Sequence, residues 1–366
     1  MIYLDNGATS FHKPPTVARA MAEAVARYAN PGRGGYSAAM DGARAVYRCR
    51  RKAASFFGCE PEQVVFTSNC THGLNIAIRT LVKAGSRVVI SGFEHNAVTR
   101  PLHLLGAKTT VAGRKLFDQA DTLQEFEDAL KQGQDAAIFT HVSNAFGYIL
   151  PVQQMAALCR QYQVPFVVDA AQSAGCLNVN LRSWGADFIA MPGHKGLLGP
   201  QGTGILLCGR KPEPLLAGGT GSESASQEMP DFLPDRLEAG TLNVPGIVGL
   251  EAGLGYLSQR GISNIFRQEQ EAAADCIWEL RQMGCQVFDG PDQGGTVSFI
   301  LPGRDCEEVA DFLGKKGIAV RAGLHCAPLA HESAGTLETG TIRVSFGHEA
   351  CVTQGRLLCR ALAGLL

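Results

Sequence analysis

A single lysine stands in a glycine-rich run at residues 191–204, which reads Met-Pro-Gly-His-Lys-Gly-Leu-Leu-Gly-Pro-Gln-Gly-Thr-Gly. Small residues allow the backbone to come close to a ligand. A lysine in such a loop can form a Schiff base with a carbonyl compound. Loops usually lie on the surface, so a lone lysine in this setting is more often an exposed side chain. The role of Lys195 therefore depends on its surroundings.

Polar side chains follow several apolar segments that are predicted to be buried strands. These segments lie at residues 64–66, 87–91, 136–142, 165–169, 186–190 and 204–208. His95, Asn144, Asp169 with Gln172, and Lys195 each come shortly after one of them. Open α/β sheets bind ligands at the carboxyl ends of their strands, so we expect these side chains to meet.

The same pattern predicts the fold class. Continuous apolar strands with helical stretches between them are typical of a mostly parallel sheet covered on both faces. The C-terminal part alternates helices with strands at 297–301, 318–321 and 341–346 and is predicted to be α+β. We therefore predict an α/β protein with a large domain at 12–255. Residues 1–11 and 256–366 are expected to form a smaller domain.

Three local signals complete this prediction. A helix is predicted at 43–57, and a loop rich in Gly and Ser at 218–228 is expected to be mobile. Residues 67–73 are polar and open a helix, so Cys70 and Thr71 lie where free backbone N–H groups favour an anion. A phosphate site and a plain helix cap explain this loop equally well.

Composition excludes several classes of protein. The formal net charge is −1, which gives no indication of nucleic-acid or membrane binding. No signal peptide and no apolar run of ~20 residues is present. The twelve cysteines are scattered without a CxxC pair, so thiols in a reducing cytoplasm are expected. His325, Cys326 and His331 lack an evident fourth ligand, and no metal site is predicted.

Lys195 and Asp169 together fit one cofactor. A pyridine aldehyde requires a lysine for its aldehyde and a carboxylate for its ring nitrogen, which stays protonated and makes the ring an electron sink. His95 offers a flat group to stack on the ring, and Gln172 a donor for its phenolic oxygen. Thr71 at a helix N-terminus suits a phosphate. These requirements match pyridoxal 5′-phosphate (PLP).

With these motifs in place, the chain resembles the class V aminotransferase group, and within it the cysteine desulfurase and selenocysteine lyase family. The resemblance covers essentially the whole chain. Its motifs are YLDNGAT, EHN, HVSN, VDAAQS, GHK, EAGT and RAGLHC, at residues 3–9, 94–96, 141–144, 168–173, 193–195, 238–241 and 321–326. It implies the type I fold of PLP-dependent transferases and a homodimer with shared active sites.

The resemblance also implies residue roles. Lys195 would bind PLP covalently and move protons at the substrate α-carbon, while His95 stacks on the ring. Asp169 and Gln172 would contact the ring nitrogen and the phenolic oxygen. The remaining roles concern phosphate and substrate: Thr71, Cys70 and His194 at the phosphate, Thr241 at the phosphate of the partner subunit, and Asn144, Arg343 and Arg321 at the substrate carboxylate.

Within this group, Cys326 is the residue that separates a cysteine desulfurase from its relatives. By resemblance, its thiolate attacks the sulfur of bound cysteine, which leaves alanine and a persulfide for transfer to an acceptor protein. A nearby positive charge lowers the pKa of a thiol, and Arg321 and His325 are candidates for that charge. The short segment after Cys326 resembles a branch that includes enzymes favouring selenocysteine. Selenocysteine lyase, transamination and another β-elimination therefore stay open. Pro192 stands where the family usually has a small or hydroxyl residue.

Overall fold

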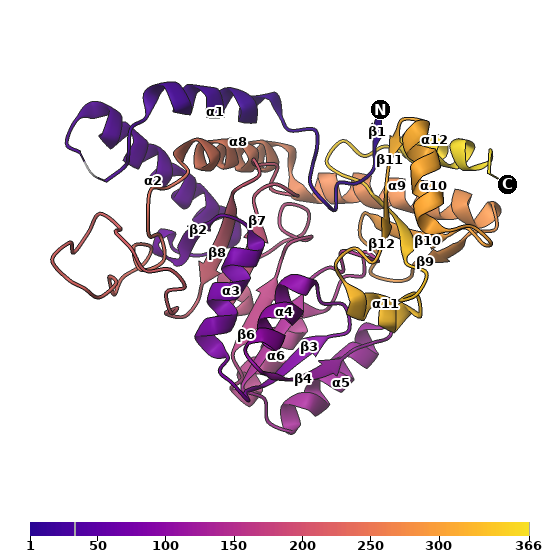
Figure 1. The fold of residues 1–366 in the computed structure, drawn as a ribbon, viewed down its shortest axis with the longest axis horizontal. Coiled ribbons are helices and arrows are strands. Elements are labelled where there is room, and N and C mark those ends of the chain that lie inside the picture. The colour runs from indigo at the N-terminus through magenta and orange to yellow at the C-terminus, as the bar shows by residue number, and fades with distance from the viewer. Residues whose placement is uncertain (33, 366) are drawn as a thin grey trace.

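The computed structural model describes residues 1–32 and 34–365. Its main feature is a seven-stranded sheet with strand order β2-β8-β7-β6-β5-β3-β4 (Figure 1). All neighbours pair in parallel except β8, which is antiparallel to β7 and β2. The mostly parallel sheet is thus confirmed. Its strands are β2 (Val64–Thr67), β3 (Arg87–Ser91), β4 (Lys108–Ala112), β5 (Ala136–Thr140), β6 (Phe166–Asp169), β7 (Phe188–Pro192) and β8 (Gly204–Cys208).

Both faces of this sheet are buried, because successive residues of one strand enter different apolar cores. In β6, Val167 packs into one core and Val168 into the other. Helices α3 (Cys70–Leu81) and α4 (Asn96–Leu104) supply the first core. The other core receives residues from α1 (Pro15–Arg27), α2 (Ser37–Phe57), α5 (Gln119–Lys131), α6 (Val152–Tyr162), α7 (Leu181–Trp184) and α8 (Val244–Arg260). A short 3-10 helix, η1, spans Pro61–Gln63.

A second, antiparallel sheet with strand order β12-β13-β10-β9 lies in the C-terminal part. Its strands and helices surround a third apolar core, and β1 (Ile2–Tyr3) joins this part by pairing in parallel with β11 (Ile318–Ala319). The other elements are α9 (Ile262–Gln282), β9 (Gln286–Phe288), β10 (Thr296–Ile300), α10 (Cys306–Lys315), β12 (Arg321–Gly323), α11 (Pro328–Ala334), β13 (Thr341–Ser345) and α12 (Val352–Leu362). The predicted domain boundary at residue 255 falls within α8, and the division into two domains stays a prediction.

Most predicted elements are confirmed, and the differences have local causes. The helix predicted from residue 43 begins at Ser37, before Gly42. A Cβ at Gly42 would lie 2.8 Å from the Ala29 carbonyl oxygen, so this glycine serves close packing and does not end the helix. The strand predicted at 318–321 is divided into β11 and β12, which belong to different sheets. Among the described residues, no helix combines the length and apolar character needed to span a bilayer.

Candidate active site

A pocket of about 240 Å³ opens at the carboxyl ends of the parallel strands. Eleven of the twelve predicted site residues line it: Cys70, Thr71, His95, Asn144, Asp169, Gln172, His194, Lys195, Arg321, Cys326 and Arg343. Thr241 does not; it lines a separate depression beside Ser68 and His72. Its predicted reach to the partner subunit's phosphate stays a prediction.

The loop that carries Lys195 is packed too tightly for larger residues. A Cβ at Gly196 would lie 2.4 Å from the backbone oxygen of Ala174, and one at Gly193 would lie 2.1 Å from Thr203 Oγ1. The ammonium of Lys195 forms no hydrogen bond with the described residues. Burial lowers the pKa of Lys195, Arg343 lowers it further and Asp169 opposes both. A larger share of neutral amine is therefore available for covalent or proton chemistry.

Asp169 is the buried carboxylate of the pocket, at the end of β6. Its Oδ1 accepts the Ala171 N–H at 2.9 Å and the thiol of Cys70 at 3.4 Å. Burial, together with the Asp169 charge, raises the pKa of Cys70 well above its usual value, so this thiol stays protonated and donates. Oδ2 has no hydrogen-bond partner among the described residues and is available to a ligand.

His95 has a fixed ring because it caps α4. Its Nδ1 accepts the Ala97 N–H at 3.0 Å, which leaves Nε2 for the pocket. Burial lowers the pKa of His95, although Asp169 acts in the opposite direction. The preceding Glu94 is fully buried and accepts the hydroxyl of Ser91 and the Thr140 N–H at 2.8 Å. Glu94 thus joins the ends of β3 and β5 beneath His95.

The N-terminus of α3 lies beside the pocket, and a phosphate site there stays a prediction. The Asn69 side chain caps the helix by accepting the His72 N–H at 2.9 Å, and Cys70 and Thr71 form the first turn beside the pocket. His194 also faces the pocket and lies 3.1 Å from Thr9 Oγ1 through its Nδ1. Burial, with Lys195 and Lys13 nearby, lowers the pKa of His194 to about 4. Pro192 ends β7 and brings neither an N–H nor a side-chain donor.

Two side chains that are predicted to contact a ligand form hydrogen bonds within the protein. Gln172 donates through Nε2 to the Gly7 carbonyl at 3.0 Å. Asn144 donates through Nδ2 to the His325 carbonyl at 2.7 Å and so holds the backbone beside Cys326. Each side chain keeps its amide oxygen and one N–H for a ligand, and their predicted contacts with PLP and substrate stay predictions.

Cys326 and Cys351 are the exposed cysteines. The Cys326 carbonyl accepts the Asn96 N–H at 2.8 Å, which fixes this loop next to His95. His325 and Cys326 both have left-handed backbones, with φ of 52° and 57°, a strained pair for residues other than glycine. Burial lowers the pKa of His325 to about 2, so the expectation that it supplies positive charge to Cys326 is wrong. Arg321 keeps that role as a prediction.

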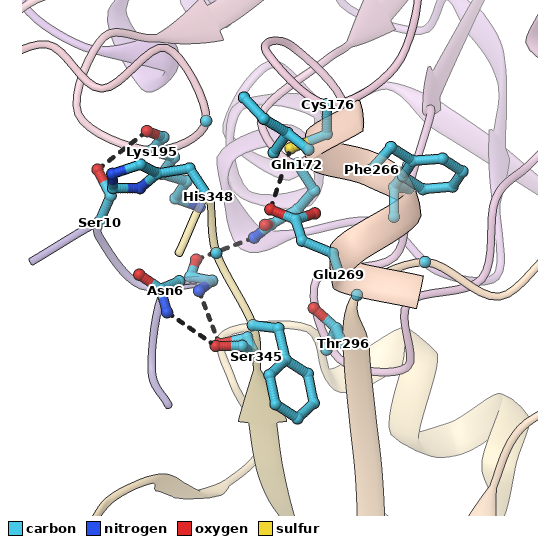
Figure 2. A pocket seen from close by; sticks show the side chains of 18 of the residues that line it. Asn6, Ser10, Gln172, Cys176, Lys195, Phe266, Glu269, Thr296, Ser345 and His348 are labelled. Atoms are coloured by element: carbon cyan, nitrogen blue, oxygen red, sulfur yellow. Dashed lines mark hydrogen bonds between the residues drawn. The ribbon is translucent and has the colours of Figure 1, made fainter. Parts of the chain in front are cut away.

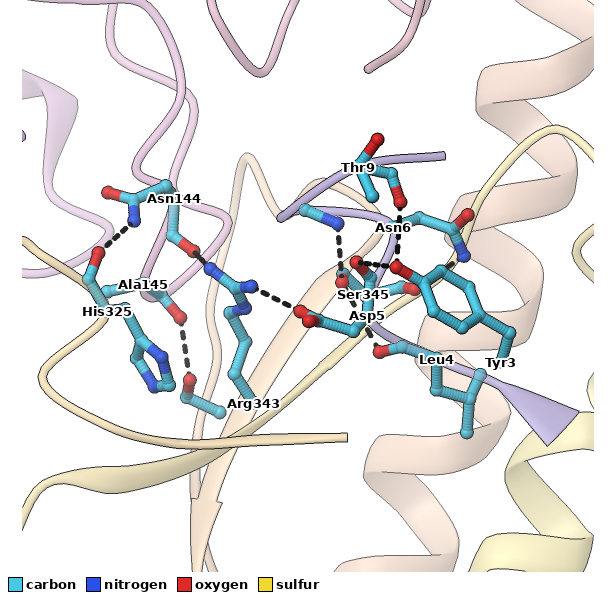
Figure 3. Close-up of polar contacts among 12 residues, drawn as sticks. Tyr3, Leu4, Asp5, Asn6, Thr9, Asn144, Ala145, His325, Arg343 and Ser345 are labelled. Atoms are coloured by element: carbon cyan, nitrogen blue, oxygen red, sulfur yellow. Dashed lines mark hydrogen bonds and ion pairs between the residues drawn. The ribbon is translucent and has the colours of Figure 1, made fainter. Parts of the chain in front are cut away.

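Arg343 is a buried cation at one side of the pocket (Figure 3). Its Nη1 donates to the Asn144 carbonyl at 3.1 Å and its Nη2 to Asp5 Oδ1 at 2.5 Å. Arg321 lies at the exposed rim and has no ion pair with the described residues. Two guanidinium groups in one pocket suit a carboxylate ligand.

A second pocket of about 60 Å³ is also lined by Lys195 and Gln172 (Figure 2). Glu269 of α9 points to Cys176, whose thiol donates to Glu269 Oε1 at 3.8 Å. Burial raises the pKa of Glu269 to about 8, so its carboxyl is mostly protonated at neutral pH. The contact between Glu269 and Cys176 joins α9 to the segment that follows Asp169.

Sequence reasoning gave no role to Asp5, Glu94 or Glu269. Asp5 and Glu94 lie within motifs that were recognised, but their neighbours in space come from distant strands. Glu269 is one of several acidic residues in a helix, and no signal in the sequence distinguishes it from its exposed neighbours.

A lysine after β7, a carboxylate at the end of β6 and an imidazole after β3 meet in one pocket, which is the pattern expected for class V enzymes. The family model "Aminotransferase class-V" matches residues 2–354. The chain belongs to this family. The fold agrees as well, because the apo structure of a cysteine desulfurase from Thermococcus onnurineus NA1 superposes with a TM-score of 0.91. That structure is 32% identical, and the match covers 100% of this chain and 94% of that one.

Relatives in this family carry similar names. A probable cysteine desulfurase from Methanothermobacter thermautotrophicus is 34% identical over 94% of this chain and 89% of its own length. A cysteine desulfurase from Cronobacter sakazakii is 32% identical over 89% of this chain and 84% of its own length. The similarity therefore extends across nearly all of both proteins.

Proposed function

We propose that this protein is a PLP-dependent cysteine desulfurase, which converts L-cysteine to L-alanine and leaves a persulfide on Cys326. The observation that carries the proposal is the exposed thiol of Cys326 in the pocket that also contains Lys195 and Asp169. The names of the relatives support the same choice.

Five features of the pocket support PLP as the cofactor. The first turn of α3, at Cys70 and Thr71, would bind the phosphate with His194 beside it. The free Oδ2 of Asp169 would pair with the ring nitrogen, and the ring of His95, fixed by Ala97, would stack. Gln172 would contact the phenolic oxygen, and Lys195 would hold the aldehyde covalently. When bound, PLP supplies an electron sink for the substrate carbanion.

The residues of the chain perform the remaining steps. Arg343, with Asn144 and Arg321, would bind the substrate carboxylate. Lys195 Nζ would move the proton at the substrate α-carbon, which its lowered pKa favours. Cys326 Sγ would then attack the substrate sulfur. One S–S bond forms and one C–S bond breaks, and the carbon that loses sulfur gains a proton, so cysteine and a thiol give alanine and a persulfide.

The assembly and location belong to the same proposal. Thr241 is exposed and lies outside its own pocket, which supports a homodimer in which it reaches the partner subunit's phosphate. All twelve cysteines are free thiols, which supports a reducing cytoplasm. The exposed position of Cys326 supports transfer of sulfur to an acceptor protein.

The decisive experiment follows alanine formation and persulfide labelling in the wild type and in Cys326→Ala. We expect the variant to lose cysteine turnover while keeping the visible absorbance of bound PLP, with Cys351→Ala as the matched exposed-cysteine control. Lys195→Ala should lose that absorbance. A wild type that binds PLP but forms no alanine would contradict the proposal. Retained turnover of selenocysteine by Cys326→Ala would instead favour a selenocysteine lyase.

A further inference from the structure

Asp5 is the anionic partner of the arginine that faces the substrate. Its Oδ1 lies 2.5 Å from Arg343 Nη2, and the two side chains are 20% and 2% exposed. Asp5 comes from the N-terminal segment and Arg343 from β13, so the pair joins two distant parts of the chain (Figure 3).

The hydrogens of Arg343 are only partly used. A guanidinium has five N–H donors, two on each terminal nitrogen and one on Nε. Nη1 gives one to Asn144 and Nη2 gives one to Asp5, while the buried Nε has no acceptor among the described residues. One hydrogen therefore stays free on each terminal nitrogen, and two parallel N–H groups are what a carboxylate accepts.

The position of Asp5 is fixed by residues 2–10, here called the N-terminal strap. Next to Asp5, the Gly7 N–H donates to Ser345 Oγ at 2.7 Å and Asn6 Nδ2 donates to the Ser345 carbonyl at 3.0 Å. At the far end, Ser10 Oγ donates to the Lys195 carbonyl at 3.1 Å. The strap thus contacts both the strand that carries Arg343 and the loop that carries Lys195.

The surrounding charges show why Arg343 needs this partner. Arg321 and Lys195 are both close enough to act on the charges of the pocket. A buried guanidinium beside other cations is costly unless an anion compensates it. Asp5 supplies that charge before and after a substrate is present, and Asn144 holds the opposite side of the group.

We propose that Asp5 is a positioning residue for the substrate carboxylate. It holds the Arg343 guanidinium so that the two free hydrogens face the pocket, and it thereby gives the site its preference for α-amino acids over simple amines. The inference rests on the proposed function, and it adds a residue that acts through Arg343 without touching the substrate.

The test compares two ligands that differ in one group. L-alanine and ethylamine share the amine and the methyl, and only L-alanine has the carboxylate. Equilibrium binding of each to the PLP-loaded protein is measured by calorimetry for the wild type, Asp5→Ala and Asp5→Asn. In Asp5→Ala we expect the Kd of L-alanine to rise at least about tenfold, because a charge-assisted contact is lost. The Kd of ethylamine should stay within about twofold.

Two further variants sharpen the result. Asp5→Asn keeps an oxygen acceptor but not the charge, so it should restore only part of the L-alanine affinity, and it carries the test if Asp5→Ala does not fold. Asp128→Ala removes an exposed carboxylate of α5 that pairs with Lys131, far from the pocket, and should leave both affinities unchanged. With L-cysteine as substrate, Asp5→Ala should raise KM more than it lowers kcat.

Equal weakening of both ligands in Asp5→Ala and Asp5→Asn would reduce Asp5 to a structural role and overturn the inference, as would no change in either ligand. The proposed function fails separately. Wild-type protein that forms no alanine from L-cysteine would contradict the function, whereas the comparison of the two ligands would still report on Asp5.

Discussion

Among the described residues, two buried arginines pair with carboxylates, and the two pairs differ in their hydrogen bonds. In the first, Arg50 and Glu238 form two bonds of 2.8 Å, and each side chain is 6% exposed. Glu238 also accepts the Phe66 N–H at 2.7 Å, and Arg50 lies 4.6 Å from the centre of the Phe66 ring. The second pair, Arg343 with Asp5, has one bond, a buried Nε without an acceptor and a free hydrogen on each terminal nitrogen.

The difference separates structure from function. Arg50 and Glu238 complete each other and fasten α2 and β2 to the segment that leads to Thr241. Arg343 is held in place by Asp5 and Asn144 but keeps unused N–H donors, as expected of a group that binds a ligand. Glu238 accepts two bonds from Arg50, whereas Asp5 accepts one bond from Arg343, and this difference distinguishes the two pairs.

The largest effect is expected at the saturated pair. Arg50→Met leaves Glu238 buried without its cation, which should lower the free energy of unfolding by about 3–5 kcal/mol. Urea unfolding measures the change. The double variant Arg50→Met with Glu238→Leu should recover most of the loss, because both charges are then absent. A single variant as stable as the wild type would show that the pair is not the fastening described above.

A smaller effect is expected from a buried carboxyl without an arginine. The pKa of Glu269 is raised from 4.5 to about 8, so between these values the folded protein keeps a proton that the unfolded chain loses. Stability from this group should therefore fall as pH rises from about 5 to about 8, with a slope of up to about 1.4 kcal/mol per pH unit.

Glu269→Gln should flatten that slope, and urea unfolding across the same pH range measures it. Glu271→Gln, an exposed neighbour in α9, is the control and should leave the slope unchanged. An unaltered slope in Glu269→Gln would mean that the Glu269 carboxyl ionises normally in the folded protein.

The smallest effect is expected from a larger residue at Gly7, beside the pair of Arg343 and Asp5. A Cβ at Gly7 would lie 3.2 Å from Ser345 Oγ and 3.3 Å from Arg343 Cζ. Gly7→Ala should cost about 1 kcal/mol of stability, because the tightly packed neighbours must shift. It should also weaken L-alanine binding more than ethylamine binding. Gly35→Ala, where a Cβ meets nothing within 4 Å, should change neither.

Much of the site was predictable from sequence because its signals are local. Apolar runs such as 87–91 and 165–169 define strands, and a polar residue at the end of each one or shortly after it marks the ligand edge of the sheet. The properties that escaped prediction depend on distant neighbours. The neutrality of His325 follows from burial, and the role of Asp5 follows from a partner 338 residues away. The edge strand β4 was not predicted because its sequence, Lys-Thr-Thr-Val-Ala, contains no continuous apolar run.

The N-terminal strap has a consequence for the order in which the protein assembles during synthesis. β2 to β8 are complete once residue 208 has been made, and the large sheet can form from them. Asp5 must wait for Arg343 and Ser345, which are made only after all strands of the large sheet. A nascent chain therefore carries Lys195 well before it carries the Arg343–Asp5 pair, which can form only once β13 has been made.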